Sequence, residues 1–129
     1  MPGEVKRRGD GDEKWEAQLR KGCLEMAVLA ALATSRSYGL EIIRTLEKHS
    51  DLVLSEGTVY PILNRLRDDG LVTSCWVESE SGHPRKYYSL TRKGYDRATR
   101  MAEVWLQFTA GVNALIEPLL PPARERARG

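Results

Sequence analysis

The stretch SEGTVYPILNRLRDDGLV, residues 55–72, restricts the possible folds of this 129-residue chain more than any other part of the sequence. Its apolar residues recur at i, i+3, i+4 and i+7, the spacing that makes the buried face of an amphipathic helix: Val59, Ile62, Leu63 and Leu66. Ser55 suits the N-cap, and Gly70 stands where a left-handed residue closes a helix. Pro61 lacks a backbone donor, so we expect a first turn that is distorted or begins late. The pattern predicts a helix over about residues 55–69.

Two further helical patterns precede this segment. A broad apolar stripe from Trp15 onward predicts a first helix that is covered on most sides and ends near TSRS at residues 34–37. YGLEIIRTLEKHS, at residues 38–50, predicts a shorter second helix. Two short helices joined by a tight link, the second amphipathic with hydrogen-bond donors on its outer face, form a helix-turn-helix pair.

Beyond Gly70 the period of the pattern changes to two. LVTSCWVES at residues 71–79 and RKYYSLT at 85–91 predict two strands, and ESGHPR between them supplies the Gly and Pro of a turn. This hairpin is the wing of a winged helix. Thr91 can cap a last helix whose apolar residues recur at three- and four-residue steps, as in helices that pack along another helix. We therefore expect a mainly α fold with a small β-hairpin (α+β): a winged helix-turn-helix with a long C-terminal dimerisation helix.

Charge, cysteine content and hydropathy limit the classes of function. A formal charge of +2 and a pI near 8.6 are too mild to show a polyanionic partner, so basic residues that bind nucleic acid would have to be clustered. Cys23 and Cys75 form no CxxC pair, which indicates reduced thiols. The N-terminus does not resemble a signal peptide, and the longest apolar run, MAVLAALA, is far too short to span a membrane. We expect a soluble cytoplasmic protein with no membrane partner.

Four segments resemble, in order, the PadR-type family of winged-helix transcriptional regulators: LRKGCLEMAVLAAL, SYGLEIIRTL, SEGTVYPILNRLRDDGLV and GHPRKYYSLTRKG. The likeness covers roughly residues 19–110. It implies a homodimer that binds promoter DNA, usually represses transcription and is often released by a small ligand. Members of the family commonly carry an acidic residue directly after the Arg-Leu of the recognition helix, where this chain has Arg67. The base preference of the family therefore cannot be carried over to this chain.

The outer face of the 55–69 helix carries the candidate DNA-binding residues. Gly57 leaves room where the helix start would approach a phosphate, whose natural partners are the leading backbone N–H groups. The Thr58 and Tyr60 hydroxyls can bond backbone oxygens, while Asn64 and Arg65 can reach base edges in the major groove. The alternative is a solvated outer face.

The predicted wing adds basic residues at or beside its tip. Arg85 and Lys86 can follow the DNA backbone or enter a minor groove, so we expect both to contact DNA. The role of His83 stays open. The acidic Glu78 and Glu80 favour a solvated loop, or a steering role that keeps only the basic side near DNA.

The last helix allows two interpretations of its large side chains. Met101, Trp105 and Phe108, together with Trp15 of the first helix, could bind a small aromatic or hydrophobic effector. The alternative is that they form dimer core, which is the commoner use of such a stripe. A homodimer would engage two half-sites at once. The residues expected at the dimer interface are Ala98, Ala102, Trp105, Val112 and Ile116.

The domain organisation follows from these patterns. The expected parts are a disordered N-terminal arm at residues 1–13, a winged helix-turn-helix DNA-binding domain at 14–91 with its recognition helix at about 55–69 and its wing at about 72–91, a dimerisation helix at 92–119 and a flexible tail at 120–129.

An enzyme is not expected. His49 and His83 have no nucleophile motif beside them, and no phosphate-binding glycine loop or metal-ligand spacing is present, so we predict no catalytic residue, cofactor or metal. The hypothesis is a ligand-responsive repressor that binds a palindromic operator in double-stranded DNA as a homodimer. Two alternatives stay open: a winged helix used for protein–protein contact, and a metal- or redox-sensing regulator that uses Cys23 and Cys75.

Overall fold

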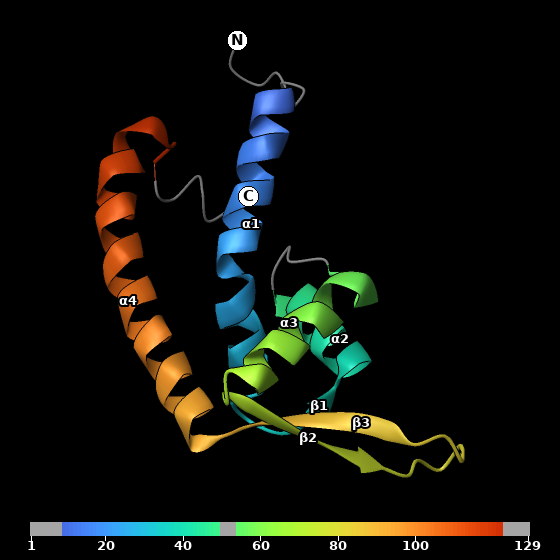
Figure 1. Cartoon of the computed structure of the whole chain (residues 1–129). Coiled ribbons are helices and arrows are strands. Elements are labelled where there is room, and N and C mark those ends of the chain that lie inside the picture. Colours follow the sequence, from blue (N-terminus) through green and yellow to red (C-terminus); the bar gives the residue numbers. More distant parts are fainter. Residues whose placement is uncertain (1–8, 50–53, 123–129) are drawn as a thin grey trace.

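The computed structural model describes residues 9–49 and 54–122, which form four α-helices and a three-stranded antiparallel sheet (Figure 1). The predicted mainly α winged helix with a hairpin is confirmed. Residues 1–8 of the predicted arm and 123–129 of the predicted tail lie outside the described residues. The elements are α1 (Asp10–Ala31), β1 (Ser37–Tyr38), α2 (Gly39–His49), α3 (Glu56–Asp68), β2 (Val72–Val77), β3 (Arg85–Leu90), α4 (Arg92–Ile116) and a 3₁₀ turn, η1 (Glu117–Leu119).

The core lies where α1, α2, α3 and the sheet meet. The predicted stripe of α3 is confirmed, because all four of its apolar residues are buried. They join apolar side chains from the other elements: Val28, Leu29, Leu32, Ile42, Ile43, Leu46, Leu54, Leu71, Val72 and Tyr88. Burying a side chain of this size stabilises the fold by about 1.5 to 3 kcal/mol, so this cluster fixes the position of α3.

Both ends of α3 follow from local chemistry. The helix begins directly after Ser55, whose carbonyl accepts from the N–H groups of Thr58 and Val59, each at 3.0 Å. The expected late start was wrong, because the helix begins at Glu56. Pro61 cannot donate to the Gly57 carbonyl, and both residues are exposed. At the other end Gly70 has φ +76°, which confirms the left-handed cap.

The sheet contains a strand that the sequence pattern did not predict. β1 pairs with β3, which gives the order β1-β3-β2, and Ser37 lies opposite Tyr88. Tyr38, predicted to lie in the second helix, belongs to β1 and meets Tyr87 edge to face with ring centroids 5.4 Å apart. Its N–H donates to the Glu41 carboxylate at 3.2 Å, so α2 begins at Gly39.

The first helix begins at Asp10, so assigning residues 10–13 to a disordered arm was wrong. The N–H of Gly9 donates to the Asp12 carboxylate at 3.3 Å, and the Gly9 carbonyl accepts from the N–H of Glu13 at 3.1 Å. Acidic side chains in a first turn are also favoured by the helix dipole. Gly9, Asp12 and Glu13, all within the predicted arm, therefore form the helix start.

The direction of α4 is set at its first turn. Thr91 caps the helix as predicted, because its hydroxyl accepts from the N–H of Gly94 at 3.0 Å. The same hydroxyl donates to the carbonyl of Gly70 at 2.6 Å. Gly94 is buried against the Leu71 backbone, where a Cβ would overlap the carbonyl oxygen. These contacts direct α4 away from the hairpin and along α1, as Figure 1 shows.

Candidate nucleic-acid interface

The outer face of α3 is open to solvent. Gly57, Tyr60 and Asn64 are all exposed, on the side of the helix away from its buried stripe. Within residues 9–49 and 54–122, no other element buries these three residues. This side of α3 is therefore free to meet a large partner.

Tyr60 is held in place by the start of α2. A Cβ added at Gly39 would lie 2.6 Å from Cζ of the tyrosine and 2.9 Å from Cε1, so the ring rests directly on the glycine. Tyr60 is 37% exposed as a result. The absence of a side chain at residue 39 thus fixes where the Tyr60 ring and hydroxyl lie on the recognition surface.

The recognition helix and the hairpin form a concave surface, which we call the wing groove. Its volume is about 510 Å³. Four of the predicted DNA-binding residues meet there, Tyr60 and Asn64 from α3 and Arg85 and Lys86 from β3, although some twenty residues of chain separate the two pairs. The remaining residues that line it are Tyr38, Leu40, Trp76, Pro84 and Tyr88.

The basic side chains of the wing groove lie over aromatic rings. The Arg85 guanidinium carbon is 4.5 Å from the centroid of Tyr38, and the Lys86 ammonium is 5.9 Å from the centroid of Trp76. Lys86 also lies 5.8 Å from the ring of Tyr88. Such cation–π contacts restrain long side chains while leaving their charge available. The groove therefore presents two positive charges in defined places.

The floor of the wing groove is a tyrosine that stays protonated. Burial raises the pKa of the Tyr88 hydroxyl above 10.0, the neighbouring Tyr60 raises it further, and Arg67 lowers it in part. At neutral pH the hydroxyl is a neutral group that can both donate and accept a hydrogen bond.

Trp76 is the main residue of this surface that the sequence analysis missed. The sequence pattern placed it only within the predicted strand at residues 71–79, yet its side chain is 68% exposed. The hairpin register places it opposite Lys86, and directly opposed residues project from the same face of a sheet. Aligning the two predicted strands would have placed this tryptophan beside a predicted DNA contact.

Three predicted DNA contacts do not line the wing groove. Gly57 is exposed at the start of α3, and the Thr58 hydroxyl is hydrogen-bonded to the Ser55 hydroxyl at 3.2 Å. Arg65 is paired with Glu25 of α1 at 3.4 Å. Neighbouring residues of a helix point about 100° apart, so Arg65 turns toward α1 while Asn64 faces the groove.

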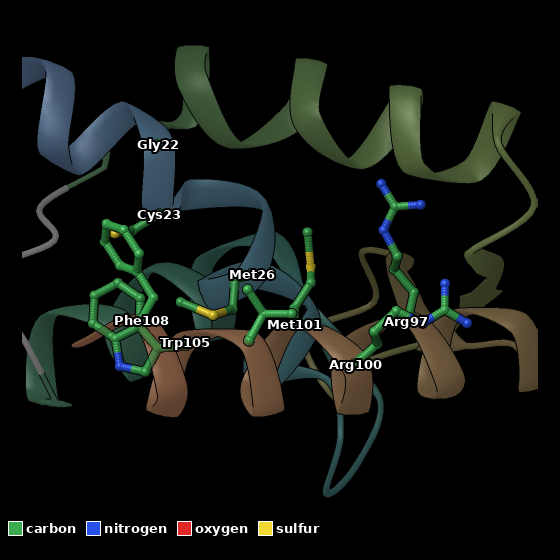
Figure 2. A pocket seen from close by; sticks show the side chains of 9 residues that line it. Gly22, Cys23, Met26, Arg97, Arg100, Met101, Trp105 and Phe108 are labelled. Carbon is green, nitrogen blue, oxygen red and sulfur yellow. The ribbon is translucent and has the colours of Figure 1, made fainter. Parts of the chain in front are cut away.

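A second concave surface, the helix groove, lies between α1 and α4 (Figure 2). Its volume is about 350 Å³. Trp105 and Phe108 lie at one end, beside Cys23, and Arg97 and Arg100 lie toward the other. The residues that line it are Gly22, Cys23, Met26, Arg97, Arg100, Met101, Val104, Trp105 and Phe108.

The helix groove contains three of the four predicted effector residues. Met101, Trp105 and Phe108 line it, but Trp15 does not and is 62% exposed. Trp15 precedes Gly22 by seven residues of α1, which places it about 10 Å further along the helix axis. Helical spacing alone could not show how far along α1 the groove extends.

The far half of α4 carries large apolar side chains that stay exposed among the described residues 9–49 and 54–122. Of the predicted dimer residues, Ala98 packs against the core, while Ala102, Trp105, Val112 and Ile116 are exposed. Other large apolar residues of α4 and the turn after it are exposed too: Val104, Leu106, Phe108, Leu115, Leu119 and Leu120.

The described residues contain neither a metal-binding cluster nor a membrane-spanning helix. Among residues 9–49 and 54–122, no three His, Cys, Asp or Glu side chains gather as a metal site would require. Cys23 is half-buried beside the helix groove and Cys75 is exposed on β2. No helix in the same two ranges is long and apolar enough to cross a membrane.

Comparison with known proteins agrees with this geometry. The model of the transcriptional regulator PadR-like family matches residues 28–100. A PadR-like transcription factor from Bacteroides fragilis is 38% identical, with 79% of this chain and 98% of that chain covered and a TM-score of 0.65. A PadR-family regulator from Eggerthella lenta is 32% identical, covering 84% and 94%, with a TM-score of 0.73. A PadR-like regulator from Bacillus cereus is 33% identical, covering 77% and 96%, with a TM-score of 0.71.

These relatives are transcriptional regulators and not enzymes, in agreement with the prediction. The matched residues 28–100 run from the last turn of α1 to the first turns of α4, so they contain both α3 and the wing. The chain belongs to the PadR-like family of transcriptional regulators.

Proposed function

We propose that this regulator is a homodimeric repressor that binds a palindromic operator in double-stranded DNA and responds to a small aromatic or hydrophobic effector. The observation that carries the DNA-binding part is the wing groove, which brings Tyr60 and Asn64 of α3 together with Arg85 and Lys86 of β3 on an exposed surface. The relatives named above come from bacteria, in which chromosomal DNA lies in the cytoplasm, so the proposal places this regulator in the cytoplasm.

In the proposed complex α3 lies in the major groove and one sugar–phosphate strand runs through the wing groove. Asn64 would read a base edge, with adenine as the favoured partner. Lys86 and Arg85 would contact phosphates, and Tyr60 would fix the register of α3 on the backbone. The exposed Trp76 would pack on the sugars of the same strand, since it lies beside Lys86.

A second copy of the chain is the partner that fits the apolar surface of α4. A monomeric protein of this size seldom leaves so many large apolar residues exposed on one helix. Pairing two copies through α4 would bury these residues and couple two recognition helices. We propose half-site centres about 34 Å apart, or a small multiple of this distance.

The helix groove is the proposed effector site. Its volume of about 350 Å³ falls within the range of small-molecule pockets, and its aromatic end suits a flat apolar ligand. Because α4 forms one wall and carries the proposed dimer interface, an occupied groove would favour one dimer geometry over another. Repression would follow from occupying an operator that overlaps a promoter, and release from a ligand that binds the other geometry more tightly.

Two substitutions test the DNA-binding part of the proposal: one removes a proposed base contact and the other a proposed phosphate contact. With an operator recovered by in vitro selection, Asn64→Ala should cost about 1 to 3 kcal/mol on the preferred base pair and relax the preference there. Lys86→Ala should weaken binding to all sequences alike and reduce the salt slope by about 0.9 for each lost phosphate contact. Fluorescence anisotropy on the operator and on single-base variants measures both effects. Equal behaviour of the two variants on every sequence would contradict the assigned roles.

A further inference from the structure

Glu25 of α1 contacts both of the helices that carry the proposed functions. Its Oε1 pairs with Nη2 of Arg65 on α3 at 3.4 Å, and its Oε2 pairs with Nη2 of Arg97 on α4 at 3.3 Å. One carboxylate is therefore shared between two guanidinium groups that are 32 residues apart in the sequence. The ion pairs Arg20–Glu16 and Arg92–Asp96, by contrast, each join residues four apart on one helix.

The Glu25 side chain is only 23% exposed, whereas that of Arg65 is 58% exposed. The carboxylate is therefore the more enclosed of the two groups, while the arginine has room to turn away from it. Arg65 lies one residue beyond Asn64, next to the proposed recognition surface. A phosphate that approaches this flank of α3 must compete with Glu25 for the same guanidinium group.

The second partner of Glu25 belongs to the helix groove. Arg97 is one of the residues that line it, and Gly22 and Met26, which flank Glu25 on α1, line it as well (Figure 2). A change in the spacing of α1 and α4 alters the Arg97–Glu25 contact directly. The carboxylate thus stands between the proposed effector site and the recognition helix.

We propose that Glu25 sets the strength of DNA binding by competing with a DNA phosphate for Arg65, and that Arg97 tunes this competition. This rests on the proposed DNA-binding function. When Arg97 is paired, the charge of Glu25 is shared and Arg65 is released more easily. When Arg97 moves away, the whole charge holds Arg65 and DNA is bound less tightly. The coupling is reciprocal: when a DNA phosphate pairs with Arg65, the carboxylate of Glu25 pairs more strongly with Arg97.

Glu25→Gln keeps the shape of the side chain and removes its charge. On a duplex selected in vitro with the wild-type protein, we expect binding about threefold tighter, a factor in keeping with a partly exposed ion pair. The salt slope should steepen by about 0.9 per protomer, because Arg65 gains a phosphate contact. Arg97→Gln should weaken binding by a similar factor. In an Arg65→Gln background both effects should disappear.

Glu16→Gln is the matched control. It removes the same charge from the same helix at a side chain that is 22% exposed and paired with Arg20. It lies nine residues before Glu25, about 13 Å along α1, which exceeds the screening length in physiological salt. Its effect on DNA affinity should be much smaller than that of Glu25→Gln.

The outcomes separate this inference from the proposed function. A wild-type protein that selects no duplex contradicts DNA binding itself. Normal wild-type binding, with a Glu25→Gln effect that is equally large when Arg65 is replaced, contradicts only the competition. Thermal unfolding shows whether each variant folds. If Glu25→Gln does not fold, the Arg97→Gln variant provides the test. If Arg97→Gln weakens DNA binding as much in the Arg65→Gln background as in the wild type, the inference is contradicted.

Discussion

Replacing Gly94 by alanine is expected to lower the free energy of unfolding by about 3 kcal/mol, near the upper end of the usual cost of overpacking. The new Cβ would overlap the carbonyl oxygen of Leu71 and lie 2.8 Å from the carbonyl carbon. Both obstacles are backbone atoms, so neither can turn aside as a flexible side chain would. Relief requires α4 to move, which stretches the 3.0 Å hydrogen bond between the Gly94 N–H and the Thr91 hydroxyl. Thermal unfolding should show a loss of about 10 °C.

Gly111→Ala on the same helix is the control for this substitution. A Cβ there meets no atom within 4 Å, so alanine should stabilise the helix by up to about 1 kcal/mol through its higher propensity. Unfolding of both variants should be followed at one protein concentration, since dimerisation would make the midpoint concentration-dependent. Similar stabilities for the two alanine variants would show that α4 is not fixed by close contact at Gly94.

Replacing Val112 by aspartate is expected to break the proposed dimer and lower the affinity for a palindromic operator about 100-fold, because each half-site would then be bound by an independent copy. Val112 lies on the far half of α4, outside the core cluster, and is already partly exposed in the single chain. The fold should therefore survive. A charge buried in an apolar interface without a partner is strongly unfavourable, which drives the copies apart. Light scattering measures the mass, and anisotropy measures the affinity.

Gln107→Asp adds the same charge to the same helix on the side opposite Trp105, because two residues advance the helix by about 200°. It should leave both the mass and the operator affinity close to those of the wild type. A Val112→Asp variant that stays dimeric, or one that binds the operator as well as Gln107→Asp does, would contradict the proposed interface.

The sequence predicted those parts of the fold that depend on local periodicity or on a single backbone conformation. The buried stripe of α3, the left-handed Gly70 and the Thr91 cap each follow from residues within one or two helical turns. The two-residue strand β1 could not be found in this way. Two residues are too few to show a period, and β1 exists only because Tyr38 meets Tyr87, which lies 49 positions later.

The candidate site was predictable in its residue types and less so in its arrangement. Tyr60, Asn64, Arg85 and Lys86 meet in the wing groove. The direction of Arg65 was not predictable, because it depends on a carboxylate 40 residues away that packing alone brings within reach. The same limitation applied to Trp15, whose distance from the helix groove depends on where α4 lies along α1.

The salt dependence of binding to duplex DNA tests the central claim most directly. A labelled operator duplex recovered by in vitro selection should be bound about 100- to 1,000-fold more weakly at 200 mM than at 50 mM monovalent salt, as expected for roughly four to six phosphate contacts per dimer. These contacts would come from Arg85 and Lys86 of each copy and from neighbouring groups on α3. No selected duplex, or an affinity that does not change with salt, would contradict the account and favour a winged helix that binds protein instead.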